Sequence, residues 1–216
     1  MELKSKFLNQ YDSLMIPRIE LFGTDQESIF YHKGAYSYAL LTLGQMSFQD
    51  ELFTEAYNYL NFIYPQSLDK SGSFIDTIKR TNKKIWKQTH LLLMYELSSQ
   101  RMVAGSALIT SMSPELPLAL ELELGIEIQR KTPSIEIGRL SIDVKHAHRS
   151  EILNLLLVNI YEILENTKGL ENVFLYSKKT LRKLYERKGY YFKNLEQYSK
   201  TLGEDIISEL ILYRNK

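Results

Sequence analysis

Apolar and polar positions along the chain predict a mixed sheet with helices on its faces. Strand candidates are continuous or alternating runs rich in leucine, aromatic and β-branched residues, and helix candidates repeat apolar residues every three or four positions. The order is strand, helix, hairpin, an undetermined element, strand, helix, strand, helix, hairpin, which favours an α/β (α+β) fold rather than a run of parallel crossovers. The predicted strands are 35–43, 90–96, 102–110, 135–143, 173–177, 190–196 and 207–214, and the clearest helices are 48–64, 151–166 and 178–188.

Capping residues give expected limits for the two longer helices. Ser47 is the predicted cap of the first, and Pro65 is expected to end it. Ser150 is the predicted cap of the second, which is apolar on nearly every side and is expected to be buried and to end at Gly169. Gly105, inside a strand, permits a bulge or the close approach of another chain segment.

Three segments are harder to interpret. In 118–129 leucine alternates with glutamate, which suits a strand, but both are good helix formers, so the type of this element stays open. Residues 1–28 predict a short amphipathic helix before Pro17 and then a loop, so we expect an extension over 1–30 and one domain over 31–216. The lysine-rich segment 66–84 favours a solvated loop and helix over a phosphate-binding surface.

Composition narrows the possible functions. A net charge of +1 gives no basic field for nucleic acid or membranes, and the absence of cysteine excludes thiolate metal sites and cysteine nucleophiles. No apolar run approaches the length of a membrane span, and the first residues lack the pattern of a signal peptide, so a cytoplasmic location is expected. Gly-x-Ser-x-Gly, His-Glu-x-x-His and phosphate-loop motifs are missing, which argues against esterases, zincins and nucleoside triphosphatases.

The stretch 134–192 resembles the GNAT acyltransferase superfamily. A glycine-containing strand, a polar loop, a buried helix, a strand and a short helix occur in order, and KLYERKGYYF is similar to the tyrosine-containing fourth helix of that family, with Tyr185, Gly189 and Tyr190 at its motif positions. The resemblance extends more weakly over 35–213. It implies a GNAT-like, mixed, mostly antiparallel central sheet flanked by helices.

One branch of the superfamily is especially similar. Glu136-Ile137-Gly138-Arg139-Leu140 resembles the Glu-x-Ser-Arg-Leu/Phe pattern of acyl-homoserine-lactone synthases and long-chain N-acyl amino acid synthases. It also resembles the Glu-x-Gly-x-Leu strand of the thermostable-haemolysin-like family, whose ending is similar to VFLYSKKTLR. The resemblance implies transfer of an acyl group from acyl-CoA or acyl carrier protein to a small amine or amino acid, with no metal. It leaves the oligomeric state unknown.

Two departures from the family pattern bear on the substrates. Ordinary acetyltransferases of the superfamily carry a glycine-rich loop before the long helix, where backbone N–H groups approach a pyrophosphate. Here the loop reads HAHRSEI without glycine, which points toward the acyl synthases. The arginine that those synthases usually place after Gly-Ser of the third strand is also missing, because Ala107 and Leu108 follow Ser106.

Acyl transfer needs a placed nucleophile, a base for its proton and donors for the developing oxyanion. The resemblance implies that a bulge at Gly138 supplies a backbone N–H to the oxyanion, although this glycine also suits helix packing. Tyr185 is the candidate acid for the leaving thiolate; its alternative role is packing beside Leu181.

Glu136 and Arg139 are the other candidate catalytic residues. Glu136 is a possible base or anchor, and Arg139 a possible carboxylate ligand; a buried structural ion pair with other partners is the alternative. Three positions apart on a strand, they point to opposite faces unless a bulge at Gly138 shifts the phase.

The donor is expected to lie along the end of this strand and the start of the long helix. The candidate contacts are Leu140, Ser141, Ile142, His148, Arg149 and Ser150, with Arg149 and Ser150 nearest the phosphate because a helix N-terminus attracts anions. His146 and His148 form a His-x-His pair, but no third zinc ligand is evident and we expect no metal.

Two rival functions stay open. The first is a non-catalytic GNAT-like domain that binds acyl-CoA or a partner, which the missing glycine loop favours. The second is a haemolysin-like effector that acts on membranes, for which the sequence shows neither a signal peptide nor a cationic amphipathic helix.

Overall fold

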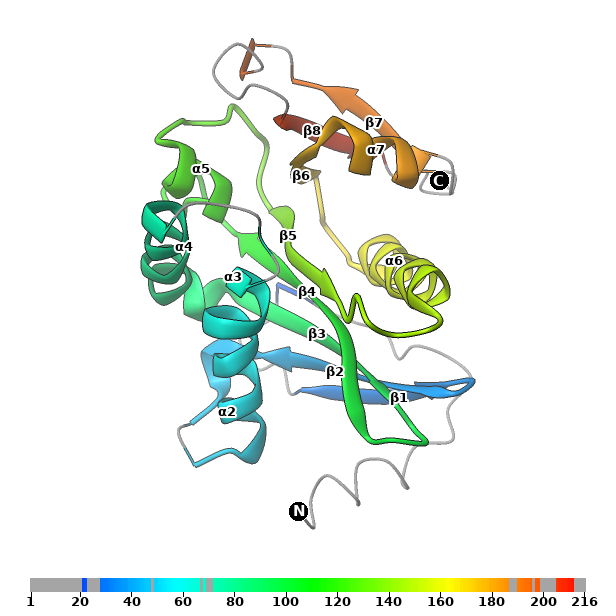
Figure 1. Cartoon of the computed structure of the whole chain (residues 1–216). Helices are drawn as coiled ribbons and strands as arrows, with labels where there is room; N and C mark the ends of the chain where they lie inside the picture. The colour runs from blue at the N-terminus through cyan, green and yellow to red at the C-terminus, as the bar shows by residue number, and fades with distance from the viewer. Residues whose placement is uncertain are drawn as a thin grey trace.

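One mixed sheet runs through the molecule, in strand order β1-β2-β3-β4-β5-β6-β8-β7 (Figure 1). The computed structural model describes residues 21–22, 28–47, 49–66, 68, 72–186, 190–195, 197–198 and 205–211. Of the described strand pairs only β5 and β6 are parallel, and α6 makes the crossover between them. The strands are β1 Ile29–Lys33, β2 Tyr36–Thr42, β3 Thr89–Glu96, β4 Arg101–Ser111, β5 Ser134–Ile142, β6 Asn172–Lys178, β7 Tyr191–Asn194 and β8 Asp205–Ile211.

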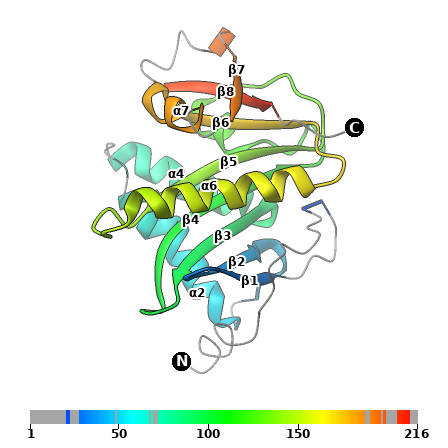
Figure 2. The same ribbon diagram turned by 90° about the vertical axis from the view of Figure 1, so that its right-hand side faces the viewer.

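Helices cover both faces of the sheet. Figure 2 shows α6 lying across one face, and Figure 1 shows α2, α4 and α5 on the opposite side. The helical elements are η1 Leu43–Gln45, α2 Glu51–Asn58, the π-helical turn η2 Tyr59–Ile63, α3 Tyr64–Gln66, α4 Gly72–Ile85, η3 Trp86–Gln88, α5 Ala119–Leu124, α6 Arg149–Asn166 and α7 Lys179–Glu186. The mixed, mostly antiparallel sheet flanked by helices confirms the predicted fold class.

The continuous apolar runs of the central strands follow from burial on both faces. In β3, Leu92 and Met94 belong to the core beneath α6, whereas Leu91 and Leu93 belong to the core beneath α2 and α4. Successive side chains point to opposite faces, so in a strand with helices on both sides most positions on either face are apolar. This explains why the sequence signal there is a run rather than an alternation.

The two predicted hairpins are confirmed. β3 pairs antiparallel with β4, and β7 pairs antiparallel with β8. Residues 29–33, which the apolar pattern left unassigned, form the edge strand β1. The amphipathic helix expected before Pro17 lies outside the described residues.

The predicted start and end of the first helix were wrong. The helix starts at Glu51 with Asp50 as its N-cap residue. Ser47 caps only the turn before it, where its Oγ accepts a hydrogen bond from the Gln49 N–H (3.3 Å) and its N–H donates to the Asp50 carboxylate (2.6 Å). Pro65 does not end it either. The wider turn η2 precedes the proline, with the Tyr64 N–H donating to the Tyr59 carbonyl, and helix continues through Gln66.

The expected limits of the long helix were also inaccurate. α6 begins at Arg149 with His148 as its N-cap residue, because the Ile152 N–H donates to the His148 carbonyl (3.0 Å). Ser150 is therefore inside the first turn. The helix ends at Asn166, and Gly169 follows in the left-handed conformation with φ 71°.

The undetermined segment forms the helix α5. Glu121 stands at its third position and its carboxylate accepts a hydrogen bond from the Leu118 N–H (2.8 Å), while Gly125 ends the helix with φ 65°. A carboxylate at the third position and a left-handed glycine at the end are helix signals that the Leu/Glu alternation does not show.

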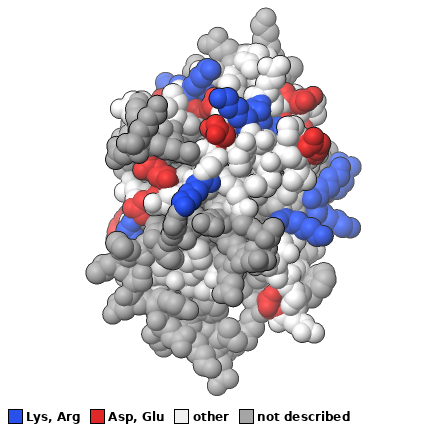
Figure 3. Space-filling view, turned by 180° about the vertical axis from the view of Figure 1, so that it is seen from behind, with Lys and Arg blue, Asp and Glu red and all other residues white. Residues whose placement is uncertain are grey.

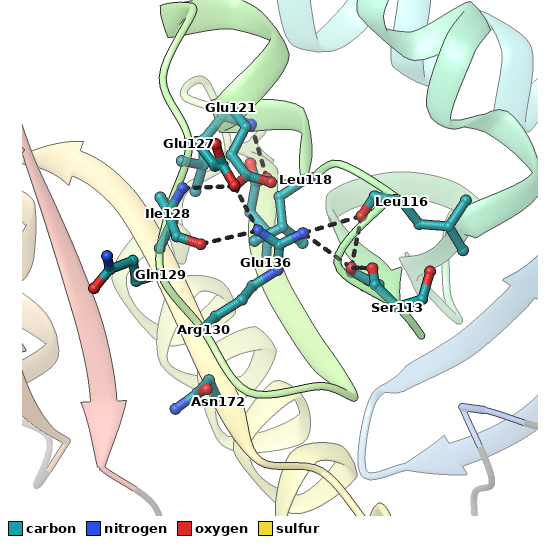
Figure 4. A network of polar contacts seen from close by, with 12 residues as sticks. Ser113, Leu116, Leu118, Glu121, Glu127, Ile128, Gln129, Arg130, Glu136 and Asn172 are labelled. Carbon is teal, nitrogen blue, oxygen red and sulfur yellow. Dashed lines mark hydrogen bonds and ion pairs between the residues drawn. The ribbon is translucent and has the colours of Figure 1, made fainter.

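A buried ion pair fixes α5 and the segment after it (Figure 4). The Arg130 guanidinium contacts the Glu121 carboxylate and donates to the Leu116 carbonyl (3.1 Å) and the Ser111 Oγ (3.2 Å) at the end of β4. The Glu121 Oε1 that contacts Arg130 also accepts a hydrogen bond from the Ile128 N–H (2.8 Å). Because both side chains are buried, removal of either leaves a charge without compensation.

We expect Arg130→Met to lower the free energy of unfolding by about 3–5 kcal/mol, since it leaves the Glu121 carboxylate buried and unpaired. Urea denaturation of the wild type and the variant measures this loss. The control is Arg101→Met, which removes an ion pair to Asp143 on a largely exposed arginine and is expected to cost less than about 1 kcal/mol. Equal losses in the two variants would contradict the structural role of the buried pair.

Candidate functional site

The site begins where two neighbouring strands separate. β5 pairs with β6 only from Ser134 opposite Asn172 to Ile137 opposite Leu175. Beyond that point β5 follows β4, and β6 follows β8. A pocket of about 230 Å³ opens in the gap. Its walls are Tyr64, Leu68, Phe74, Glu123, Glu136, Ile137, Gly138, Arg139, Leu140, Leu175, Tyr176, Ser177, Lys178, Tyr185 and Asp205.

A bulge in β5 lies at the same place. Gly138 is opposite Ala107, but the next pair is Ser141 opposite Gly105, so two residues of β5 face the single residue Ser106 of β4. Arg139 takes the left-handed conformation with φ 54°, unusual for a residue with a side chain. The sequence predicted a bulge at Gly138; the strained residue is the one that follows it.

The bulge brings both charged residues of the motif to one pocket. Regular alternation would place Glu136 and Arg139 on opposite faces, but the extra residue shifts the phase, and both side chains line the cavity. The orientation left open by the sequence is therefore resolved in favour of a shared site.

The bulge also directs a backbone donor into the gap. The Ser106 Oγ, on the β4 side, donates to the Gly138 carbonyl oxygen (3.0 Å). In a planar trans peptide the carbonyl and the following N–H point in opposite directions. The Arg139 N–H consequently points away from the Ser106 hydroxyl, and Arg139 itself lines the gap from which β6 has departed.

Glu136 is a buried carboxyl with a raised pKa. Its side chain is 3% exposed and accepts a hydrogen bond from the Leu120 N–H of α5 (2.9 Å). Burial raises its pKa to about 7, and the nearby Glu123 carboxylate adds to this; Arg139 and the N–H groups of Leu120 and Ala119 act in the opposite direction. A carboxyl with this pKa exchanges its proton near neutral pH.

Arg139 is held by an internal ion pair. Its guanidinium contacts the Glu123 carboxylate, donates from Nε to the Asn82 Oδ1 (2.9 Å), and lies 5.5 Å from the centre of the Tyr64 ring. This geometry matches the alternative of a buried ion pair with other partners. Because its charge is already matched, Arg139 orders the wall of the pocket around Glu136.

Tyr185 presents a hydroxyl without a partner. Its side chain is 2% exposed, it lines the pocket, and its oxygen has no hydrogen bond within the described part of the chain. The ring packs edge-on against Tyr190 and Phe192, with centroids 6.0 and 5.8 Å away. Burial raises its pKa above the usual range, so the phenol stays protonated. Gly189, the other motif position in this helix, lies outside the described residues.

The residues expected along the donor fall into two groups. Leu140 lines the pocket, but Ser141 and Ile142 are not among its walls, and the Ser141 Oγ instead donates to the Tyr59 hydroxyl (3.1 Å). The second group, His148, Arg149 and Ser150, is exposed at the start of α6.

The loop before α6 uses several of its own N–H groups. The His148 N–H donates to the His146 Nδ1 (3.1 Å), and the Arg149 N–H donates to the His146 carbonyl (3.3 Å). Since Nδ1 accepts, the ring proton is on Nε2, which donates to the Glu96 carboxylate (3.2 Å) at the end of β3. His146 thus engages the N–H groups of 148 and 149 within the loop itself.

Several pocket residues were not predicted from the sequence. Tyr64 and Phe74 come from α3 and α4, and Glu123 comes from the element whose type was open. Asp205 is opposite Lys178 on β8 and accepts a hydrogen bond from the Tyr176 hydroxyl (2.9 Å). None of these residues belongs to a local motif; only the folded chain brings them to the gap.

The described residues include no group of three His, Cys, Asp or Glu side chains placed to hold a metal ion. Within the same residues, none of the helices has the length and apolar character needed to cross a bilayer. Among the coloured residues of Figure 3, positive and negative side chains are interspersed, apart from a group of Lys and Arg at the right-hand edge, where α4 lies.

α4 carries exposed Lys79, Arg80, Lys83 and Lys84 and buries Ile78 and Ile85. It is thus a cationic amphipathic helix, which the sequence had not indicated, but its apolar side is committed to the core. The segment forms the predicted solvated helix.

Comparison with known proteins rests on structure alone, because no protein-family model and no curated protein matches the sequence. A structure described as an acetyltransferase of the GNAT family from Desulfovibrio desulfuricans aligns with a TM-score of 0.54 at 11% identity, over 82% of this chain and 99% of that one. An acyl-CoA N-acyltransferase from Pseudomonas aeruginosa aligns with a TM-score of 0.50 at 15% identity, over 81% and 98%.

A CoA-dependent acyl-homoserine lactone synthase, BjaI, solved with SAM and isopentyl-CoA, aligns with a TM-score of 0.54 at 13% identity, over 81% of this chain and 82% of that one. At these identities the likeness establishes architecture and leaves substrates undetermined. The chain has the fold of the GNAT acyltransferases.

Proposed function

We propose that this protein transfers an acyl group from an acyl thioester, acyl-CoA or acyl carrier protein, to the nitrogen of a small amine or amino acid. The observation that carries the proposal is the convergence of three groups on one pocket: the Arg139 N–H, the Glu136 carboxyl and the Tyr185 hydroxyl. Each matches one requirement of acyl transfer, namely an oxyanion donor, a base and an acid.

The gap between β5 and β6 suits a thioester because it exposes strand backbone to a ligand. The thioester carbonyl would accept a hydrogen bond from the Arg139 N–H, whose direction is fixed by the Ser106 bond to Gly138. The polar walls around Glu136 would face the incoming amine, while Tyr185 would face the sulfur.

The proposed reaction is a direct displacement. The amine gives a proton to the Glu136 carboxylate as its nitrogen attacks the carbonyl carbon, and a C–N bond forms. The C–S bond then breaks, and the thiolate takes a proton from the Tyr185 hydroxyl. The proton held by Glu136 balances the one lost by Tyr185, so an amide and a free thiol result. The chain has no cysteine to carry a covalent intermediate.

A second function is favoured by the loop before α6. Because N–H groups at 148 and 149 are bonded to His146, a pyrophosphate finds fewer free donors there than in a glycine loop. A domain that binds acyl thioesters without turnover would tolerate this arrangement. Under both proposed functions, His148, Arg149 and Ser150 are the proposed contacts to the phosphates of the donor.

The first test uses acyl-CoA and acyl-carrier-protein donors of several chain lengths with a panel of amines and amino acids, measuring release of free thiol. We expect turnover with at least one pair. Tyr185→Phe should lower kcat about 100-fold or more while donor binding is kept, because the ring stays and only the acid is lost. Thermal stabilisation by a donor without thiol release would support the binding function instead, and the absence of both would exclude each.

The second test follows the proton of Glu136. A base must be deprotonated, so kcat/KM should rise with pH up to about 7, the pKa of Glu136, and level off above it. Glu136→Gln should remove this rise and lower the plateau by about 100-fold. A wild-type profile that is flat between pH 5 and 8 would contradict the assignment.

The third test is independent of turnover. The raised pKa means that folded Glu136 holds its proton between about pH 4.5 and 7 whereas the unfolded carboxyl has lost it, so stability falls as pH rises through this window. Relative to Glu136→Gln, the free energy of unfolding of the wild type should decrease by about 2–3 kcal/mol from pH 5 to pH 8. Urea denaturation at both pH values measures it; a constant difference between the two proteins would show that the pKa of Glu136 is not raised.

A further inference from the structure

A tyrosine outside the pocket contacts the backbone of the bulge. Tyr59, the first residue of the π-helical turn η2, is 1% exposed and does not line the cavity. Its hydroxyl donates to the Arg139 carbonyl oxygen and accepts a hydrogen bond from the Ser141 Oγ (3.1 Å). Both partners are in β5, at the bulge and at the residue where regular pairing with β4 resumes.

The sheet is shaped to admit this side chain. The Tyr59 ring lies directly on Gly105 of β4, where an added Cβ would be 2.6 Å from the Cε2 of the ring. Only glycine leaves the space for the ring to reach across β4 to β5. Gly105 therefore serves the approach of Tyr59, in addition to standing beside the bulge.

Two consecutive carbonyls of the bulge are consequently held by hydroxyl groups. Ser106 holds the carbonyl of Gly138 from β4, and Tyr59 holds the carbonyl of Arg139. These bonds constrain the peptide groups on either side of Arg139, whose φ of 54° is otherwise costly. The Ser106 bond holds the peptide that carries the Arg139 N–H, and the Tyr59 bond holds the next peptide, so the backbone of Arg139 is fixed between two anchored planes.

We propose that Tyr59 is a positioning residue: its hydroxyl fixes the bulge so that the Arg139 N–H is aimed at the thioester carbonyl. This role rests on the proposed acyl transfer. Tyr59 does not touch the substrate and acts through the backbone of β5. The residue thus couples the turn η2, on one face of the sheet, to the oxyanion donor in the gap.

The test compares Tyr59→Phe with the wild type. The ring is kept, so the packing on Gly105 remains and only the hydroxyl bonds are lost. We expect kcat to fall about 10- to 100-fold while the KM for the donor changes less than about twofold, because a misdirected oxyanion donor affects the transition state more than binding. Ser141→Ala removes the hydrogen bond that the Tyr59 hydroxyl accepts and keeps the one that it donates to the Arg139 carbonyl. This variant should give a smaller fall in kcat.

The matched control is Tyr95→Phe. Tyr95 is also buried, and its hydroxyl bonds Glu55 of α2 to the sheet away from the bulge. It should lower the melting temperature about as much as Tyr59→Phe and leave kcat near the wild-type value. Equal falls in kcat for the two variants would show that the loss of activity follows from general destabilisation, and would overturn the proposal.

Hydrogen exchange provides a readout that does not need turnover. In Tyr59→Phe the peptide covering 137–142 should exchange at least about fivefold faster than in the wild type, because both hydrogen bonds of the Tyr59 hydroxyl to β5 are lost, and in Tyr95→Phe it should not. Unchanged exchange in Tyr59→Phe would show that the Tyr59 hydroxyl does not hold the backbone of the bulge. Faster exchange with unchanged kcat in an active enzyme would overturn its link to catalysis, and a protein inactive with every donor would instead contradict the proposed function.

Discussion

The extra residue in β5 is the constraint on which the site depends. The bulge lies where β6 stops pairing with β5. At this one place the side chains of β5 no longer alternate between faces, and its backbone is left without a neighbouring strand on the β6 side. Without the bulge, the Arg139 side chain would point to the face opposite Glu136. The left-handed backbone of Arg139 is a local cost that its neighbours offset, through hydroxyl bonds to two carbonyls and an ion pair to its side chain.

Of the three glutamates buried around the gap, only Glu136 has no arginine partner of its own. Glu123 is matched by Arg139 and Glu121 is matched by Arg130, so both carboxylates have a full positive partner. Glu136 has only backbone donors and the field of an arginine already engaged elsewhere. Burial therefore dominates the proton equilibrium of Glu136 and raises its pKa. Glu121 and Glu123 are therefore structural ion-pair partners, and Glu136 is the carboxyl left for proton transfer in the proposed reaction.

Local patterns determined most of the architecture and part of the site. Apolar runs located the central strands because these are buried on both faces, and the motif resemblance identified Glu136, Arg139 and Tyr185, which the fold brings to one pocket. The pattern could not decide the phase of Arg139, because a bulge depends on pairing with Ser106 of another strand. It also missed Tyr59 and Asp205, whose contacts arise only when distant elements meet, and it placed the start of the first helix at Ser47, whereas the helix begins after Asp50.

The short ladder between β5 and β6 has a mechanical consequence. Four residue pairs connect the strands on one side of the gap to β6, β8 and β7 on the other, whereas β3 and β4 share a much longer ladder. The opposing walls of the pocket, Arg139 on β5 and Ser177 on β6, therefore belong to two parts of the sheet whose strands pair with each other only through this short ladder. The core beneath α6 includes residues of both β5 and β6, so the packing of this helix is the second connection between the two sides of the gap.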